Sequence, residues 1–208
     1  MDVSAGVALE ARLALPAGAT AGVVICHPHP LYGGDMDNAL VLDVRDACHR
    51  AGLGTLRFNF RGTGRSTGRH DDGRGERDDV RAALAALRER LPATGTVALA
   101  GYSFGAAMAA AVAAAGEPLG GLALLAPPLV ATGYRWGGPL TAVSGPALVV
   151  AGTVDEYCPV SALDELRAQW PKADVRMIEG ADHFFGGHGA LLIEALRAWA
   201  AAVAPGRG

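Results

Sequence analysis

The chain has 208 residues, of which 50% are hydrophobic and 19% charged, and its 18 basic and 21 acidic side chains give a formal net charge of −3. A chain of this length can bury a substantial core without disulfides, so we expect residues 1–208 to form a single domain. The small negative charge argues against a nucleic-acid partner and against attraction to anionic membranes. Basic and acidic residues alternate between positions 61 and 79, which predicts a solvated loop of mixed charge.

The cysteines, Cys26, Cys48 and Cys158, are widely spaced and form neither a CxxC pair nor a zinc-binding pattern. We therefore expect reduced thiols in a cytoplasmic protein that needs no metal and no cofactor. Residues 1–6 contain neither the basic nor the apolar segment of a secretion signal. No apolar run is long enough to cross a bilayer, so membrane association is not expected and the alanine-rich residues 106–115 are predicted to form a helix buried against a sheet.

Apolar and polar residues alternate from Val7 to Leu15, which predicts an edge strand with one wetter face. Later runs that are apolar on both faces predict buried parallel strands, at residues 21–26, 55–60, 97–100, 121–126, 146–151 and 175–178. Segments of helical length and period lie between them, at residues 38–50, 76–91, 104–115, 161–170 and 189–203. This alternation predicts the α/β class, a doubly wound, mostly parallel sheet flanked by helices.

Residues 127–145 join two predicted strands and are rich in proline and glycine. The segment is too short and too broken to form a cap domain, so we expect an open site. Tyr134 and Trp136 are its large apolar side chains, and we expect them to form a wall that contacts the substrate.

The pentapeptide Gly101-Tyr102-Ser103-Phe104-Gly105 follows the apolar run at residues 97–100 and precedes the alanine-rich segment. A Gly-x-Ser-x-Gly sequence between a strand and a helix is typical of a nucleophile elbow, a sharp turn that exposes the serine hydroxyl. Small residues on both sides allow the strand and the helix to approach closely. Ser103 is therefore the predicted nucleophile.

The elbow, the strand order, the motif at residues 26–38 and the motif at residues 57–66 together resemble the α/β-hydrolase superfamily. More narrowly, they are similar to small, capless bacterial hydrolases related to the dienelactone hydrolase group, from about residue 23 to the carboxyl terminus. Dienelactone hydrolases proper carry a cysteine in the elbow. Ser103 in its place favours ordinary ester chemistry, and Cys158 lies outside the elbow.

In that fold the serine, the acid and the histidine follow one another along the chain. Only His183 and His188 come after Ser103, and His183 lies just past a predicted strand, where it can reach the serine. Asp155 follows the preceding strand, in a segment that resembles the acid loop of the family. The predicted catalytic residues are therefore Ser103, Asp155 and His183, with His188 left as a surface or supporting residue.

An oxyanion hole needs two backbone N–H groups aimed at the developing alkoxide. The resemblance implies that one comes from Phe104 and the other from the loop after residue 26. Pro28 and Pro30 have no N–H to donate, which leaves His29, Leu31 or Tyr32. Because residues 29–31 resemble the His-Gly-x turn of the family, the second donor is predicted to be Leu31, with His29 as the next choice.

His27 and His29 alternate with prolines that hold the loop extended, so we interpret them as histidines bonded to the backbone and not as metal ligands.

These residues predict a serine hydrolase that cleaves a small ester or related acyl substrate through an acyl-enzyme. Two alternatives remain at this stage. An acyltransferase or a peptidase uses the same triad, and a non-catalytic binding protein can keep the fold without turnover. The expected partner is a small-molecule acyl compound, and the oligomeric state is left open.

Overall fold

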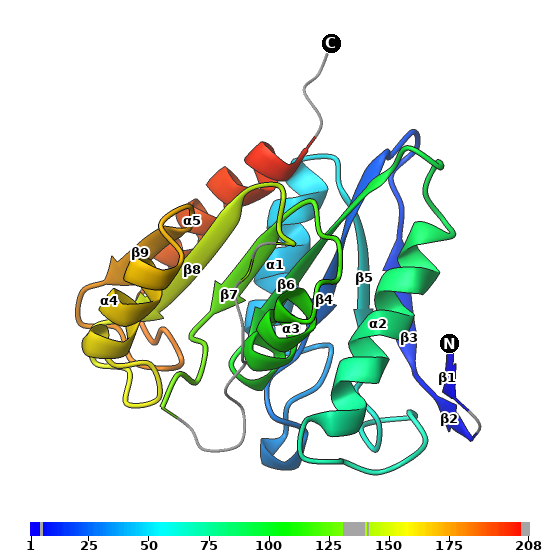
Figure 1. Ribbon diagram of the computed structural model, residues 1–208, viewed down its shortest axis with the longest axis horizontal. Helices are drawn as coiled ribbons and strands as arrows, with labels where there is room; N and C mark the ends of the chain where they lie inside the picture. Colours follow the sequence, from blue (N-terminus) through cyan, green and yellow to red (C-terminus); the bar gives the residue numbers. More distant parts are fainter. Residues whose placement is uncertain (5, 131–139, 141, 205–208) are drawn as a thin grey trace.

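The structure, a computed structural model, describes residues 1–4, 6–130, 140 and 142–204. Its centre is a seven-stranded sheet with the strand order β3-β5-β4-β6-β7-β8-β9 (Figure 1). The edge strand β3 (Ala11–Ala14) runs antiparallel to β5, and the remaining neighbours are parallel. The parallel strands are β4 (Ala21–Cys26), β5 (Gly54–Phe58), β6 (Thr96–Tyr102), β7 (Leu122–Leu125), β8 (Ala147–Gly152) and β9 (Asp174–Ile178). β1 (Asp2–Ser4) and β2 (Val7–Ala8) form a separate two-stranded sheet.

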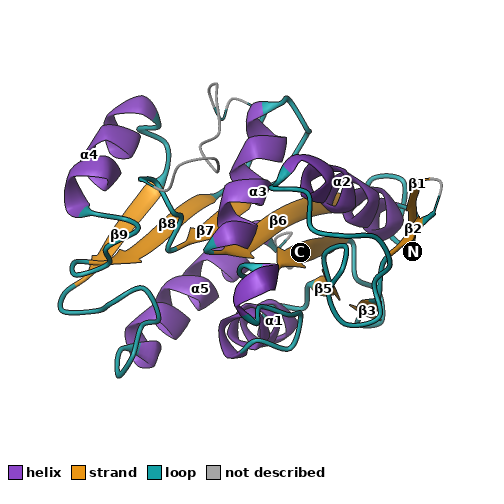
Figure 2. Cartoon of the chain, turned by 90° about the horizontal axis from the view of Figure 1, so that it is seen from below, coloured by secondary structure: helices purple, strands orange, loops and turns teal. Residues whose placement is uncertain are grey.

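Helices cover both faces of the large sheet (Figure 2). α1 (Ala39–Arg50) and α5 (Gly189–Val203) pack with one apolar cluster. α2 (Arg74–Arg88), α3 (Phe104–Ala114) and α4 (Val160–Gln169) pack with the other. Every residue of β4 and of β8 is buried, as expected for strands covered on both sides. The predicted α/β fold with a mostly parallel sheet is confirmed.

α3 lies against the middle of the sheet, and its residues from Phe104 to Ala113 are all buried. Alanine side chains are small enough to let a helix lie close to the strands, which explains why an alanine-rich segment occupies this position. Among the described residues, no helix combines the length and the apolarity that crossing a bilayer requires.

The sheet edge differs from the prediction. The alternating segment from Val7 to Leu15 breaks into β2 and β3, and all residues of β3 are exposed. Leu13 and Leu15, predicted on the buried face, are both exposed, whereas Leu9 is buried. The predicted one-sided burial is therefore wrong for β3, because this strand pairs with β5 on one side only and lies outside the helical layers.

The charged segment from residue 61 to residue 79 also differs. Part of it is the first turn of α2, and Glu76 and Asp79 are fully buried. The Glu76 carboxylate accepts hydrogen bonds from the backbone N–H groups of Asp71 and Gly73, at 2.8 and 2.9 Å. The prediction of a solvated loop is wrong here because these carboxylates find enough donors to leave water.

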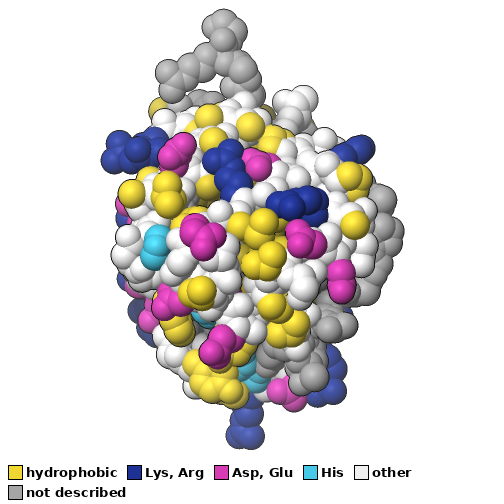
Figure 3. Space-filling view, turned by 90° about the vertical axis from the view of Figure 1, so that its left-hand side faces the viewer, with side chains coloured by type: hydrophobic (Ala, Val, Ile, Leu, Met, Phe, Trp, Pro, Cys, Tyr) yellow, Lys and Arg dark blue, Asp and Glu magenta, His cyan; other side chains and the backbone are white. Residues whose placement is uncertain are grey.

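Elsewhere the surface charge is mixed. On the face turned toward β9, the described basic and acidic side chains lie interspersed with apolar ones and form no patch of one sign (Figure 3).

Candidate active site

Ser103 lies in a sharp turn between β6 and α3. Its backbone angles are φ 53° and ψ −119°, in the left-handed region that residues with side chains rarely adopt. The Ser103 N–H donates to the carbonyl oxygen of Leu125 in β7 at 2.9 Å, and its own carbonyl accepts the N–H of Ala107 in α3 at 3.1 Å. The neighbouring strand and helix thus hold the turn from both sides.

The two glycines of the pentapeptide permit this turn. A Cβ atom on Gly101 would lie 2.3 Å from the carbonyl oxygen of Gly105, and one on Gly105 would lie 2.4 Å from the carbonyl oxygen of Cys26 in β4. Both positions therefore require glycine, because backbone fills the space that a side chain would need.

A continuous line of hydrogen bonds joins Ser103, His183 and Asp155. His183 Nε2 lies 2.9 Å from Ser103 Oγ, and His183 Nδ1 lies 3.0 and 2.9 Å from the two Asp155 oxygens. Asp155 Oδ1 also accepts the backbone N–H groups of Tyr157 and Cys158, at 2.9 and 3.1 Å. With a carboxylate beside Nδ1, the imidazole carries its proton there and leaves Nε2 bare to accept the serine hydroxyl proton.

Two tyrosines fix the histidine further. Tyr102 donates its hydroxyl proton to the His183 carbonyl oxygen at 3.2 Å, and the Tyr157 ring lies 4.8 Å from the imidazole centre. Burial, reinforced by the charge of Asp155, raises the pKa of Tyr102 to about 12 and keeps this phenol a donor. Burial also raises the pKa of Cys158, so this cysteine remains a thiol and not a thiolate nucleophile.

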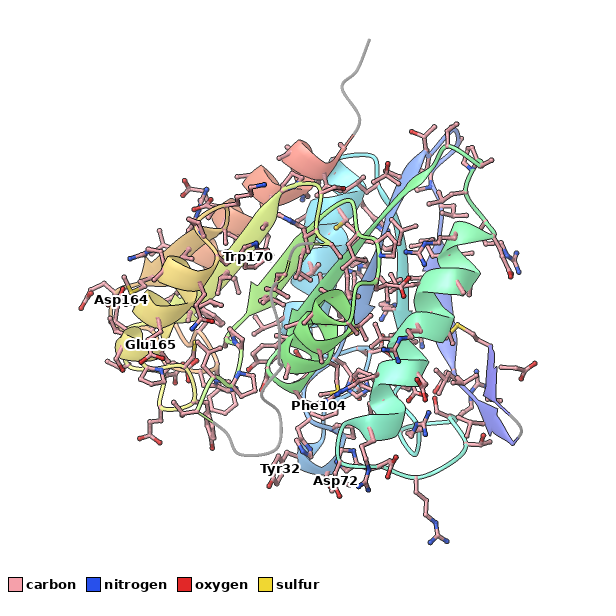
Figure 4. The ribbon with its side chains drawn as sticks, viewed as in Figure 1. Tyr32, Asp72, Phe104, Asp164, Glu165 and Trp170 are labelled. Carbon is pink, nitrogen blue, oxygen red and sulfur yellow. The ribbon has the colours of Figure 1, made fainter. Side chains whose placement is uncertain are left out.

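The loop after β4 forms a tight turn, η1 (Pro30–Tyr32). His29 Nδ1 accepts the N–H of Leu31 at 3.2 Å, and the His29 carbonyl accepts the N–H of Tyr32 at 3.1 Å. The ring of His29 lies 5.0 Å from that of Phe104, the residue after Ser103. Figure 4 shows Tyr32 and Phe104 at the same edge of the sheet. The amide of Leu31 is thus engaged within the turn, while His29 lies beside the elbow.

His27 is fully buried and connects the loop after β4 to the loop after β5. Its Nε2 accepts the N–H of Phe60 at 3.0 Å, and its Nδ1 donates to the carbonyl oxygen of Pro28 at 2.6 Å. Burial lowers the pKa of His27 to about 4, so the ring is neutral. For His27 the predicted backbone-bonded role matches these contacts.

A cavity of about 500 Å³ opens above Ser103, and we call it the serine pocket. Its described lining contains no Asp, Glu, Lys or Arg side chain. It is lined by Pro28, His29, Tyr32, Gly33, Gly34, Asn38, Tyr102, Ser103, Phe104, Pro128, Tyr157, His183 and Phe184. The predicted wall residues Tyr134 and Trp136 lie outside the described residues.

The sequence profile of the family described as "Alpha/beta hydrolase domain" matches residues 20–203. The chain belongs to this family. An uncharacterized protein of Rickettsia prowazekii (strain Madrid E) is 31% identical over 185 residues, which cover 85% of this hydrolase and 77% of that protein. The solved structure of an alpha-beta serine hydrolase homologue from Coxiella burnetii is 36% identical, covers 91% of this chain and 90% of its own, and superposes with a TM-score of 0.78.

A second solved structure comes from Xanthomonas campestris and is described as a member of the a/b serine hydrolases without a lid. It is 33% identical, covers 96% of this chain and 91% of its own, and has a TM-score of 0.82. These comparisons make this hydrolase an α/β serine hydrolase of the capless kind, and the predicted resemblance is confirmed.

The hydrolase has a second cavity on the other side of the η1 turn, which we call the polar pocket. Its volume is about 560 Å³. Eight of its sixteen lining residues carry charged or polar side chains, namely Glu10, Asp35, Asp37, Asn59, Arg61, Thr63, Arg69 and His70. Most of these groups bond to neighbouring loops: Glu10 to Asn59 and Arg65, and Arg61 to Asp79. Leu31 lines this pocket and not the serine pocket.

Sequence reasoning missed Tyr157 and Phe184 around the serine pocket of the hydrolase, and it considered Tyr32 only as a possible backbone donor. The sequence could have indicated Tyr157 and Phe184 by their position beside predicted catalytic residues, since Phe184 follows His183 and Tyr157 lies two residues after Asp155. His188, the other histidine after Ser103, begins α5 and bonds through Nδ1 to the carbonyl oxygen of Gly186 at 2.7 Å. It has no place in the lining of either pocket.

Proposed function

We propose that this chain is a carboxylesterase-like serine hydrolase that cleaves a small ester or related acyl substrate through Ser103, His183 and Asp155. One observation carries the proposal: the hydrogen-bond line from Asp155 through His183 to Ser103, each link about 3 Å long, which ends in an open pocket. A non-catalytic relative would be free to lose this alignment. A role in the cytoplasm fits the three unpaired cysteines, all of which are buried.

The proposed reaction has two halves. His183 Nε2 takes the proton of Ser103 as Oγ attacks the acyl carbon, and Asp155 stabilises the imidazolium that forms. The tetrahedral intermediate then expels the alcohol, which receives the proton from His183. Water, deprotonated by the same imidazole, cleaves the acyl-enzyme and restores Ser103.

The oxyanion formed in each half needs two N–H donors. We propose the amide of Phe104 for one. For the other we favour His29 over Leu31, because His29 lines the serine pocket beside Phe104, whereas the Leu31 amide bonds to the His29 ring. A structure of a phosphonate adduct tests this choice through the amide that contacts the phosphoryl oxygen.

The test of the function is labelling by a fluorophosphonate combined with hydrolysis of p-nitrophenyl acetate. We expect the label on Ser103, and we expect Ser103→Ala to lower kcat on the order of 10⁶-fold, as loss of a triad nucleophile does. Ser144→Ala is the matched control, since Ser144 Oγ donates to the carbonyl oxygen of Leu119 and lines neither pocket. An unlabelled wild-type protein without esterase activity would refute the proposal. Adding alcohol or amine acceptors to the assay separates hydrolysis from acyl transfer.

A further inference from the structure

Three large aromatic side chains on the rim of the serine pocket face solvent. Tyr32 is 87% exposed, Phe184 70% and Tyr157 50%, and all three line the pocket. A contiguous apolar patch on the surface of a soluble protein commonly marks a binding site. The rim rings are therefore the candidate surface for binding a ligand at this pocket.

The rim rings are held by the loops that carry the proposed catalytic groups. Phe184 lies between the buried residues His183 and Phe185, and its N–H donates to Asp182 Oδ1 at 3.0 Å. These contacts anchor the backbone of Phe184 while its ring stays exposed. An anchored backbone leaves only side-chain rotation to be lost when a ligand binds.

Tyr32 and Tyr157 are anchored in a similar way. The N–H of Tyr32 donates to the His29 carbonyl, and the turn closes with Gly33 at φ 80°, a conformation that favours glycine. The N–H of Tyr157 donates to Asp155 Oδ1 at 2.9 Å. The rim is thus built from three loops, which follow β4, β8 and β9.

The chemistry of the rim is aromatic and uncharged. Aromatic rings favour other aromatic rings in offset or edge-on contact, an attraction beyond the burial of area alone. The described lining offers no countercharge for an ionised substrate group. The pocket volume of about 500 Å³ lies within the range of small-molecule sites.

We propose that the ester cleaved at Ser103 carries an uncharged aromatic ring, held on the rim by Tyr32 and Phe184. This inference rests on the proposed esterase function and names its substrate class. The ring can belong to the acyl part or to the alcohol part of the ester, since the two parts lie on either side of the scissile bond.

Pairs of substrates that differ only in aromaticity test the proposal. Ethyl 3-phenylpropanoate against ethyl 3-cyclohexylpropanoate probes the acyl side, and benzyl acetate against cyclohexylmethyl acetate probes the alcohol side. We expect kcat/KM to favour the aromatic member of one pair by about tenfold, the size of one or two ring contacts. The pair that shows the preference identifies which part of the ester meets the rim.

Variants of the rim make the test specific. Tyr32→Ala and Phe184→Ala should bring the ratio of kcat/KM between the two members of that pair close to one, whereas Tyr32→Phe, which keeps the ring, should preserve it. Leu191→Ala is the control for loss of an exposed apolar side chain, because Leu191 is 52% exposed on α5 and lines neither pocket. It should keep the wild-type ratio.

Equal kcat/KM within both pairs overturns the inference, and so does a wild-type ratio in both Ala variants. The fluorophosphonate label distinguishes failure of this inference from failure of the proposed function. A labelled Ser103 with hydrolysis of ethyl acetate but no aromatic preference defeats this inference alone. Absence of both label and hydrolysis defeats the proposed function beneath it.

Discussion

The serine pocket and the polar pocket lie on opposite sides of one turn and share Gly33 and Gly34 in their linings, yet their chemistry is opposite. The described lining of the serine pocket has no Asp, Glu, Lys or Arg, whereas the polar pocket has acidic and basic side chains together. Most of those charges are already committed. Arg61 holds Asp79 with a 2.7 Å bond, and Glu10 holds the side chain of Asn59 at 2.9 Å.

Two cavities of similar size can therefore have different roles. The Asn59 amide fastens the loop after β5 to the loop after β4, and Arg61 fastens it to Asp79 in α2. In the serine pocket the side chains of Ser103 and His183 bond to each other, and His183 bonds in turn to Asp155. We therefore expect substitutions in the serine pocket to reduce activity and spare stability, and substitutions around the polar pocket to do the reverse.

The largest expected effect tests the serine pocket. In Asp155→Asn the amide oxygen can still accept the N–H groups of Tyr157 and Cys158, but the amide nitrogen facing His183 Nδ1 favours the wrong tautomer. We expect kcat/KM for p-nitrophenyl acetate to fall about 10⁴-fold with little change in Tm. Asp164→Asn, on the exposed surface of α4 (Figure 4), should change neither. A loss of stability in place of activity would break the comparison.

The next largest effect tests the polar pocket. Arg61→Ala leaves Asp79, which is fully buried, without the guanidinium that donates to both of its oxygens. Removing one partner of a buried ion pair costs about 3–5 kcal/mol, which urea unfolding measures directly. Arg81→Ala is the control, because its ion pair with Asp78 is exposed and contributes under ~1 kcal/mol. The comparison predicts that folded Arg61→Ala enzyme keeps most of its specific activity.

His27 connects the loop after β4 to the loop after β5, and its buried ring makes the stability of the folded protein depend on pH. Its pKa in the folded protein is about 4, below the reference value of 6.5, because the buried ring disfavours charge. As the pH falls from 6.5 to 4, the imidazole of His27 therefore becomes protonated in the unfolded chain but stays neutral in the folded chain. The stabilisation is fully present above pH 6.5 and decreases through this window by about 3 kcal/mol.

Urea unfolding of wild type and His27→Gln at pH 7.5 and pH 4.5 measures that contribution. The variant should be less stable at pH 7.5, because it loses the ring that connects Phe60 and Pro28, and should lose less stability on acidification. Parallel losses in the two proteins would contradict the neutral, buried state of His27.

The smallest effect concerns the support of the imidazole. Tyr102→Phe removes only the hydroxyl that donates to the His183 carbonyl at 3.2 Å. We expect a loss of about 1 kcal/mol in unfolding free energy and a reduction of kcat severalfold, with KM nearly unchanged. A reduction as large as that of Asp155→Asn would mean that the Tyr102 hydroxyl takes part in the reaction itself and would contradict a supporting role for it.

Much of the fold could be predicted from the sequence, because each buried parallel strand carries its own apolar run. The predicted strand at residues 97–100 lies inside β6, the one at residues 146–151 is shifted by one residue from β8, and the helix at residues 189–203 coincides with α5. The edge was harder: the alternation around Leu13 indicates a strand but does not reveal that no layer covers it. Whether a layer covers the strand depends on contacts between segments far apart in the chain, and the local pattern of residues does not show these contacts.

The candidate site, like the fold, could be predicted only in part from the sequence. The pentapeptide around Ser103, with glycines where backbone approaches to 2.3 and 2.4 Å, predicts the elbow because the turn is a local, short-range structure. The order of serine, acid and histidine in the family left His183 and His188, of which His183 follows a strand, and the resemblance to the acid loop of the family predicted Asp155. The choice between His29 and Leu31 was open in the sequence, because it depends on which amide the η1 turn uses internally.

The sequence by itself determined the α/β alternation, the serine at the elbow and the order in which the other two groups follow. Only the tertiary structure decided that Glu76 and Asp79 are buried structural charges and that Tyr32, Tyr157 and Phe184 share one rim. The reason is physical. Loops that are far apart in the chain meet at the carboxyl ends of parallel strands, so the character of each pocket arises from that meeting and not from any one segment.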